Sequence, residues 1–239
     1  MTEIRAALVT GATSGIGRAA ALKLAQDGFK VLVHGRDTER GAAVVKKIES
    51  AGGSAEFLTA DLTDVRAIRH LAAAAGDVDV LVNNAGFSWF GPTAELEPDR
   101  YDELFDANVR SAYFLTAAIA PRMAERGRGT VINVGSMAGQ IGLAGGAAYS
   151  ATKAALASLT RSWAAEYSPR GVRVNTIAPG PAYTGGSSRE SLTALGNTTL
   201  LSRAAEAEEI GDVIAFLASP AAGYITGAVI PVDGGRTAV

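Results

Sequence analysis

Two side chains that could move a proton stand four residues apart in the stretch YSATKAALASL, residues 149–159. Tyr149 carries a phenol that can give or take a proton, and Lys153 carries a cation that could tune it. The alanine-rich stretch is predicted to be helical, and residues i and i+4 of a helix lie on one face. The spacing therefore lets both side chains act on a common point, although such pairs also occur by chance on ordinary helix surfaces.

A second candidate is the glycine-rich turn TGATSGIG, residues 10–17, which joins a strand-like run to a helical pattern. Because glycine has no Cβ, the backbone can approach a phosphate, and the N–H groups at a helix N-terminus attract its charge. The turn lies inside a βαβ unit of about 30 residues, which predicts a dinucleotide site. Its spacing, G-x-x-x-G-x-G, differs from the commoner G-x-G-x-x-G fingerprint.

The second predicted strand ends in VLVHGRD, where an NAD site commonly places an acid on the ribose 2′-hydroxyl. Gly35 stands near that place and Arg36 follows, so a guanidinium could grip a 2′-phosphate. A charge-assisted hydrogen bond of about 1.5–3 kcal/mol corresponds to roughly 10- to 150-fold preference, and NADP is therefore predicted over NAD. Alternatively, Arg36 is only solvated at a helix start, and Asp37 serves as the N-cap or weakens the preference for the phosphate.

The elements that position these residues follow from the pattern of apolar residues. Short apolar runs alternate with longer helical patterns and lack outward-facing polar residues, which indicates a parallel sheet covered on both faces. We predict one doubly wound α/β Rossmann domain over residues 1–239, with a seven-stranded parallel sheet. The strands are expected at 5–10, 30–35, 55–60, 79–84, 130–135, 172–178 and 228–233, and the helices at 15–27, 38–51, 64–75, 98–125, 149–168 and 206–218.

The segment 180–203 is the least regular part of the chain and is rich in glycine, serine and threonine. A long irregular insertion in a compact domain is often a functional lid, so a substrate lid is expected here, with an ordinary surface loop as the alternative.

Composition narrows the function classes. The chain of 239 residues is 48% hydrophobic, has a formal charge of −2 with interspersed acids and bases, and contains no cysteine. These values give no electrostatic footprint for nucleic acid or an anionic membrane and exclude thiol chemistry. Two isolated histidines, His34 and His70, are too few for a histidine-based metal cluster. With neither a long apolar run nor a signal peptide visible, we expect a soluble, cytoplasmic protein.

Several polar residues follow predicted strands, at the sheet edge where open α/β folds bind ligands. Asp61 could accept a hydrogen bond from an adenine amino group, and the stretch NNAG, residues 83–86, suits backbone contact with a cofactor. Ser136 ends the fifth strand on the same edge.

Eight short motifs, taken in order, resemble those of the classical short-chain dehydrogenase/reductase family over essentially the whole chain. They are TGATSGIG, ADL, NNAG, DANVRSAY, INVGS, YSATK, VNTIAPGPAYT and YITGAVIPVDGG. The resemblance implies a catalytic tetrad in which Tyr149 exchanges the proton, Ser136 hydrogen-bonds the substrate oxygen, Lys153 holds the nicotinamide ribose and Asn108 helps to place a water. The implied cofactor-binding residues are Gly11, Thr13, Ser14, Gly15, Ile16, Gly17, Arg36, Asp61, Leu62, Asn84, Ala85, Gly86, Tyr149, Lys153, Pro179, Gly180 and Thr184.

The implied reaction is hydride transfer between NADP and a carbonyl or secondary alcohol, which needs a proton donor at the substrate oxygen. Tyrosine has a pKa of about 10, so work near neutrality needs a fall of about 3 units, or about 4 kcal/mol. A cation about 4 Å away at an effective dielectric of about 20 supplies about 4 kcal/mol, so Lys153 is sufficient in scale. A cofactor-binding regulator without turnover is the alternative, which the intact tetrad disfavours.

Two departures from the family pattern bear on the site. Gly135 stands before Ser136 where a second serine is frequent, and Ser14 stands where some NADP-preferring members carry a basic residue. Cofactor choice therefore depends mainly on Arg36.

The substrate is less well defined than the reaction. Mostly apolar candidate wall residues favour a neutral or partly apolar ketone or alcohol, although Trp89 and Phe90 could equally pack in an interface. The pattern is closest to 3-oxoacyl-(acyl-carrier-protein) reductases, and three arginines could meet an acidic carrier or simply be solvated; the sequence does not commit to that substrate. The wall candidates are Phe87, Ser88, Trp89, Phe90, Met137, Ile141, Pro181 and Tyr183, and the arginines are Arg122, Arg126 and Arg128.

Apolar positions on the helical stretches 98–125 and 149–168 exceed what one sheet-facing stripe needs, and the resembled family is usually tetrameric. The excess positions include Tyr113, Phe114, Leu156, Leu159 and Trp163. A homo-oligomer, expected to be a tetramer, follows.

Overall fold

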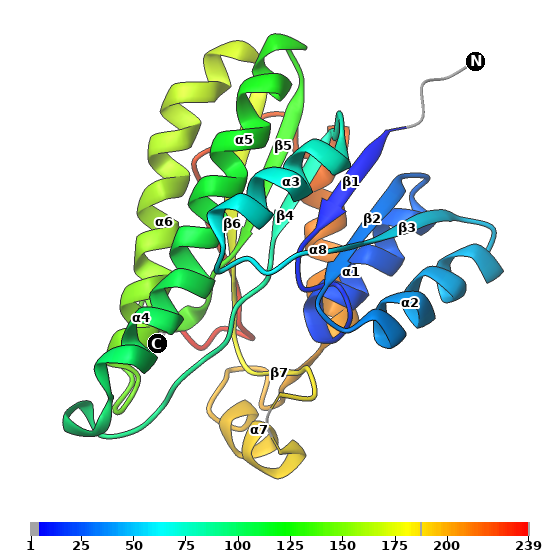
Figure 1. Cartoon of the computed structure of the whole chain (residues 1–239). Coiled ribbons are helices and arrows are strands. Elements are labelled where there is room, and N and C mark those ends of the chain that lie inside the picture. The colour runs from blue at the N-terminus through cyan, green and yellow to red at the C-terminus, as the bar shows by residue number, and fades with distance from the viewer. Residues whose placement is uncertain (1–4, 187, 239) are drawn as a thin grey trace.

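The computed structural model describes residues 5–186 and 188–238, and its centre is a seven-stranded parallel sheet (Figure 1). The strand order is β3-β2-β1-β4-β5-β6-β9, and each neighbouring pair is parallel. The predicted doubly wound α/β fold is therefore confirmed. The strands are β1 (Ala6–Val9), β2 (Lys30–Gly35), β3 (Ser54–Thr59), β4 (Val80–Asn83), β5 (Gly129–Val134), β6 (Val172–Pro179) and β9 (Val229–Val232).

Helices cover both faces of this sheet, as expected for strands that are apolar on both sides. One face packs against α1 (Gly15–Gln26), α2 (Thr38–Ser50) and α8 (Ala207–Ala218). The other packs against α3 (Val65–Ala75), α5 (Ser111–Glu125) and α6 (Ala147–Tyr167).

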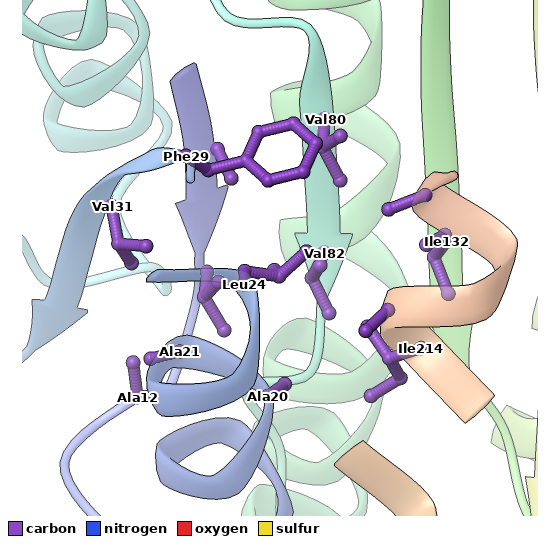
Figure 2. Close-up of a cluster of buried hydrophobic side chains, with 14 of the residues drawn as sticks. Ala12, Ala20, Ala21, Leu24, Phe29, Val31, Val80, Val82, Ile132 and Ile214 are labelled. Atoms are coloured by element: carbon purple, nitrogen blue, oxygen red, sulfur yellow. The ribbon is translucent and has the colours of Figure 1, made fainter. Parts of the chain in front are cut away.

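Alternating strand residues supply the two hydrophobic cores. Val80 and Val82 of β4 face the α1 and α8 side, where Leu24, Phe29 and Ile214 meet them (Figure 2). Leu81, between the two valines, belongs to the opposite core. Burying side chains of this size contributes about 1.5–3 kcal/mol each, so both faces hold the sheet in place.

Strand order reverses between β1 and β4, since β1 leads outward to β2 and β4 leads the other way to β5. In open α/β sheets the crevice at such a switch point, beyond the carboxyl ends of the strands, is where ligands bind. The glycine turn follows β1, and the stretch Asn84–Gly86 follows β4.

The structure differs from the predicted elements in two places. The stretch 98–125 is not one helix but α4 (Pro98–Phe105), a π-helical turn η2 (Asp106–Arg110) and α5. The stretch 180–203, expected to be irregular, contains strand β7 (Ala182–Tyr183) and helix α7 (Arg189–Gly196), and β7 pairs with β8 (Ala205–Glu206). A π turn inside an apolar helical pattern has no strong sequence signal, because it inserts only one extra residue per turn.

Short 3-10 turns complete the described chain: η1 (Thr93–Glu95), η3 (Met137–Gly139), η4 (Ser168–Arg170) and η5 (Pro220–Ala222). None of the helices within residues 5–186 and 188–238 combines the length and the apolar character that crossing a bilayer requires.

Candidate active site

The glycine turn leads directly into α1 in a form that only glycine allows. Gly11 and Gly15 have φ of +61° and +52°, in the left-handed region. A Cβ on Gly17 would lie 2.3 Å from the carbonyl oxygen of Gly11. The N-cap Ser14 makes no side-chain hydrogen bond to the first turn in the described structure, and that turn carries no acidic residue. The α1 N-terminus therefore offers N–H groups and a positive dipole end to an anion, which fits a cofactor phosphate.

The stretch after β4 is hydrogen-bonded to the glycine turn. Asn84 Nδ2 donates to the carbonyl oxygens of Thr10 at 2.8 Å and Gly11 at 3.2 Å. Thr10 Oγ1 accepts from the backbone N–H groups of Asn84 and Ala85 at 2.9 and 3.0 Å. Two segments more than 70 residues apart in sequence thus form one rigid floor, and the predicted residues Asn84 and Ala85 lie in it.

The predicted residues after β6 reach the same place. Pro179 ends β6, and the Gly180 N–H donates to the carbonyl oxygen of Val232 at 3.1 Å. A Cβ on Gly15 would lie 2.9 Å from Thr184 Cβ, so Thr184 closes over the start of α1. Thr13, Ser14 and Ile16 lie in the turn and first residues of α1 between these contacts.

Arg36 and Asp61 follow neighbouring strands β2 and β3 and are both exposed. Asp37 is engaged locally: it caps α2 by accepting from Arg40 N at 2.9 Å, and it pairs with Arg40 Nε at 2.6 Å. The alternative in which Asp37 serves as an N-cap is therefore confirmed. No hydrogen bond or ion pair engages the Arg36 guanidinium within the described ranges, and it faces solvent at the strand end.

Asp61 and Leu62 differ in how far they are available to a ligand. Asp61 Oδ1 accepts hydrogen bonds from Thr63 N at 3.0 Å and Thr63 Oγ1 at 2.9 Å, and these bonds hold the pKa of the carboxyl below its usual value. Leu62 is buried in the core on the α3 side, so its backbone rather than its side chain is near the cofactor edge.

Tyr149 and Lys153 lie on α6, one turn apart, facing the end of β5. The Lys153 ammonium is buried, donates to the carbonyl oxygen of Val134 at 2.9 Å and lies 5.7 Å from the centroid of the Tyr149 ring. Ser136 follows β5, and its hydroxyl lies close enough to the Tyr149 phenol to act on its pKa as a hydrogen-bond partner. The Ser136 hydroxyl also accepts from Ala138 N at 3.1 Å, which fixes its position.

The expected effect of Lys153 on Tyr149 is wrong for the protein alone. Burial raises the pKa of the Tyr149 phenol, and the hydrogen bond from Ser136 opposes this shift only in part. Burial also lowers the pKa of Lys153 to about 8. Desolvation penalises both charged forms, and the ammonium is directed at Val134 rather than at the phenol. A phenolate at neutral pH therefore needs further positive charge.

Asn108 lies in the π-helical turn η2 and holds the loop after β4 against α6. Its Oδ1 accepts from Phe87 N at 2.9 Å, and its Nδ2 donates to Phe87 O at 2.9 Å and to Thr152 Oγ1 at 3.1 Å. A Cβ on Gly86 would lie 2.4 Å from Asn108 Oδ1, so Gly86 permits this contact. The side chain fixes the geometry next to Lys153, a role that sequence reasoning did not foresee.

Phe90 is the wall candidate that lies against Tyr149: the ring centroids are 5.6 Å apart, and Phe90 remains 55% exposed. Gly91 N donates to Gly145 O at 3.0 Å, which pins this loop in front of α6. Phe87 instead packs under the Arg100 guanidinium, 4.2 Å from the ring centroid. Tyr183 is tied to α7 through Thr193 Oγ1 at 2.8 Å.

The three arginines considered for a carrier protein lie at the start of β5, at the opposite end of that strand from Ser136. Arg122 and Arg126 both pair with Asp77, at 2.6 and 2.9 Å, and Arg128 pairs with Asp79 at 3.2 Å. All three guanidinium groups are therefore engaged by carboxylates within the chain, and these contacts do not support a carrier-bound substrate.

The comparisons with known proteins agree with this geometry. A family model described as short chain dehydrogenase matches residues 5–193. The chain belongs to the short-chain dehydrogenase family.

Relatives that are about equally identical in sequence to this short-chain dehydrogenase are named for different substrates. It is 38% identical to a 3beta-hydroxysteroid dehydrogenase of Mediterraneibacter gnavus, covering 96% of this chain and 94% of that one. It is 36% identical to a 3-oxoacyl-(acyl-carrier-protein) reductase of Staphylococcus aureus, covering 98% and 99%. Among solved structures, a blue fluorescent protein from a metagenomic library in complex with NADPH is 35% identical, with a TM-score of 0.91 over 97% of both chains.

The part of the short-chain dehydrogenase that the structure describes contains no group of three or more His, Asp or Glu side chains able to hold a metal ion. The polar groups near Tyr149 are instead hydroxyls, an amide and an ammonium, a set that suits proton transfer and oxygen binding.

Proposed function

We propose that the protein is an NADP(H)-dependent oxidoreductase that transfers a hydride between the nicotinamide and a carbonyl or secondary alcohol. The observation that carries this proposal is the placement of Tyr149 against Ser136 and beside the buried Lys153, at the edge of the sheet that also carries the glycine turn. When bound, the cofactor would supply the hydride and, in its oxidised form, a positive charge near the phenol.

In the reduction direction, Tyr149 donates its proton to the substrate oxygen as the carbonyl carbon gains a hydride. Ser136 donates a hydrogen bond to the same oxygen, because its hydroxyl is held at the end of β5 by Ala138. Lys153 would hold the nicotinamide ribose, and Asn108 keeps the Phe87 loop in register with α6. The raised pKa keeps the Tyr149 phenol protonated before transfer, and the positive charge of the oxidised cofactor would favour loss of that proton.

Replacing Tyr149 with Phe tests the reaction class. We expect NADPH oxidation with ketones, β-ketoesters and quinones to fall by about 10²- to 10⁴-fold, because the proton donor is lost. NADPH affinity, measured by fluorescence titration, should change less than threefold. The control is Tyr224→Phe, at a fully exposed tyrosine, which should keep full activity.

The alternative is a non-catalytic NADP-binding regulator. If NADPH bound but no carbonyl in the panel was reduced, and Tyr149→Phe left every measured property intact, that alternative would replace the enzyme proposal.

NADP preference rests on the exposed guanidinium of Arg36 and on the engagement of Asp37 with Arg40. A relative crystallised with NADPH supports the same choice. Because a charge-assisted hydrogen bond contributes about 1.5–3 kcal/mol, Arg36→Ser should weaken NADPH binding roughly 10- to 150-fold and leave NADH binding unchanged. Lys47→Ser removes an equal charge from the far end of α2 and is the matched control. Equal affinity of the unmodified protein for NADH and NADPH would contradict this prediction.

A neutral, partly apolar substrate fits the half-exposed ring of Phe90 beside Tyr149. A 3-oxoacyl thioester is the second candidate, supported by the relative in Staphylococcus aureus. Comparing kcat/KM for a simple ketone, a β-ketoester and a short 3-oxoacyl thioester distinguishes the two.

The remaining expectations belong to the same proposal. Residues 1–239 form one cofactor-binding domain, and the segment 180–203, with α7, acts as the substrate lid that Thr184 joins to the glycine turn. A cytoplasmic location stays a prediction.

A further inference from the structure

The side chain of His34, near the end of β2, joins two parts of the cofactor edge that lie on neighbouring strands. The Gly11 N–H donates to His34 Nδ1 at 3.3 Å, and His34 Nε2 lies 3.1 Å from the carbonyl oxygen of Ala60. Gly11 belongs to the glycine turn, and Ala60 immediately precedes Asp61. The ring is 3% exposed, so water cannot readily replace either partner.

These two partners determine the protonation state of the imidazole. Ala60 O can only accept, so Nε2 must carry the hydrogen; Gly11 N can only donate, so Nδ1 must present its lone pair. The neutral Nε2–H tautomer satisfies both contacts. An imidazolium would place a second N–H against the Gly11 N–H and would leave a charge in a buried position.

The charged groups around the ring also favour the neutral form. Burial is the main cause that holds the pKa of His34 below 6.5. The hydrogen bond to Ala60 O opposes this shift in part, and the nearby positive charge of Arg36 adds to it. On the β3 side the nearest carboxylate in sequence is Asp61, which is engaged by Thr63. On the β1 side the turn TGATSGIG contains no titratable residue, and Asp37, after β2, is paired with Arg40.

The backbone of His34 supports the same turn, since its carbonyl oxygen accepts from Ala12 N at 2.8 Å. Backbone contact therefore survives a substitution at this position, while the side-chain bond to Gly11 does not. The side chain alone decides whether the left-handed residue Gly11 is held from both sides, by His34 and by Asn84.

We propose that His34 is a positioning residue that holds the glycine turn in its cofactor-binding form only while its ring is neutral, so that acid weakens cofactor binding. This inference rests on the proposed binding of NADP. A proton at His34 and a bound cofactor therefore oppose each other, because the proton disturbs the glycine turn that the cofactor requires. By linkage, bound NADP⁺ must lower the pKa of His34 by the same factor by which protonation weakens NADP⁺ binding.

The test measures the dissociation constant of NADP⁺ by calorimetry from pH 5 to pH 8. Below the pKa of His34, affinity should fall up to tenfold for each pH unit. His34→Asn keeps an acceptor near the Nδ1 position but cannot be protonated, so it should bind within about threefold of the unmodified protein at pH 7.5 and lose this part of the pH dependence. The dependence that remains in His34→Asn belongs to other groups, namely the 2′-phosphate of the ligand and Lys153, whose pKa of about 8 lies at the edge of this range.

Two further variants distinguish a positioning role of His34 from a general loss of stability and from the titration of the other histidine. His34→Gln keeps a donor for Ala60 O and loses the acceptor for Gly11, so NADP⁺ affinity should fall about tenfold at pH 7.5. Its thermal unfolding midpoint should be no lower than that of His34→Asn, which loses the other side-chain contact. His70→Asn removes the exposed histidine on α3 and should leave the pH dependence intact. If the His34 variants do not fold, NMR titration of the His34 ring in the unmodified protein, with and without NADP⁺, measures the same linkage.

Identical pH dependence in the unmodified protein and His34→Asn, or a His34 pKa that NADP⁺ does not move, would overturn the inference while leaving the proposed function standing. Failure to bind NADP⁺ at every pH would overturn both.

Discussion

Among single residues, Lys153 is a buried charge that lowers the stability of the folded protein. Its ammonium is buried with a hydrogen bond to Val134 O, and its pKa falls from 10.5 to about 8. That shift corresponds to about 3 kcal/mol of penalty on the charged form at neutral pH. The proposed role of Lys153 at the nicotinamide ribose would account for a buried charge at this cost, a common compromise between activity and stability.

Lys153→Met should therefore abolish carbonyl reduction without unfolding the protein. It removes the cost of the buried charge, about 3 kcal/mol, and leaves Val134 O without its donor, a cost of about 1–3 kcal/mol. The two effects nearly cancel, so urea denaturation at pH 7 should show a change of less than about 2 kcal/mol.

The same variant carries a pH signature. Because the folded state depresses the pKa of Lys153, the unfolded state binds more protons between about pH 8 and 10.5, and this residue makes stability rise with pH across that window. Lys153→Met should show a flatter profile there. A stability loss above 4 kcal/mol, or retained turnover, would contradict the assignment.

At the scale of elements, the glycine turn depends on close approach as well as on backbone conformation. Gly15 combines a φ of +52° with a Thr184 Cβ only 2.9 Å from where a methyl would stand. Gly52, at φ +84° after α2, has the same kind of backbone but no described atom within 4 Å of that point. Comparing substitutions at Gly15 and Gly52 therefore distinguishes the cost of the left-handed backbone from the cost of a steric clash.

Gly52→Ala should lower the free energy of unfolding by about 1–2 kcal/mol, the cost of a side chain in the left-handed region, and leave NADPH affinity unchanged. Gly15→Ala should carry the same conformational cost and also weaken NADPH binding at least tenfold, because the methyl group pushes Thr184 off the start of α1. Thermal unfolding and fluorescence titration measure the two quantities. Equal NADPH affinities for both variants would show that contact at Gly15 does not matter.

The secondary-structure elements were predictable from the sequence only in part. All seven strands of the main sheet were predictable, since each is a short apolar run between turn residues. The division of 98–125 by the π turn was not, and neither was α7, because the segment around Thr193 has weak helical propensity and depends on its packing against Tyr183.

At the scale of the whole molecule, several large side chains on the described surface remain exposed. They lie on different helices: Tyr101 and Tyr113 on the α4 and α5 side, Phe216 on α8, and Tyr224 after η5. Of the positions expected to be in excess, Leu156 and Trp163 are buried within the chain, whereas Tyr113 is not. Apolar side chains exposed on several faces fit an assembly with more than one kind of contact.

We expect a homo-oligomer, most simply a tetramer, and sedimentation equilibrium should return a multiple of 24.4 kDa. Tyr113→Asp should lower that mass by placing a charge on the α5 face, and Glu95→Asp, an exposed change that conserves charge, should not. A single 24.4 kDa species at micromolar concentration would remove this prediction.

Local pattern in the sequence was enough to predict the sheet, the glycine turn before α1, and the shared face of Tyr149 and Lys153, because strands, tight turns and helix faces depend on residues within a few positions. Only the tertiary structure determined the contacts and the pKa shifts of these side chains. The direction of the Tyr149 pKa, the pairing of Arg126 with Asp77 and the bridge from His34 to Gly11 depend on burial and on contacts between residues distant in sequence. Such contacts leave no periodic signal along the chain, which is why His34 resembled an ordinary strand residue until the fold placed it beneath the glycine turn.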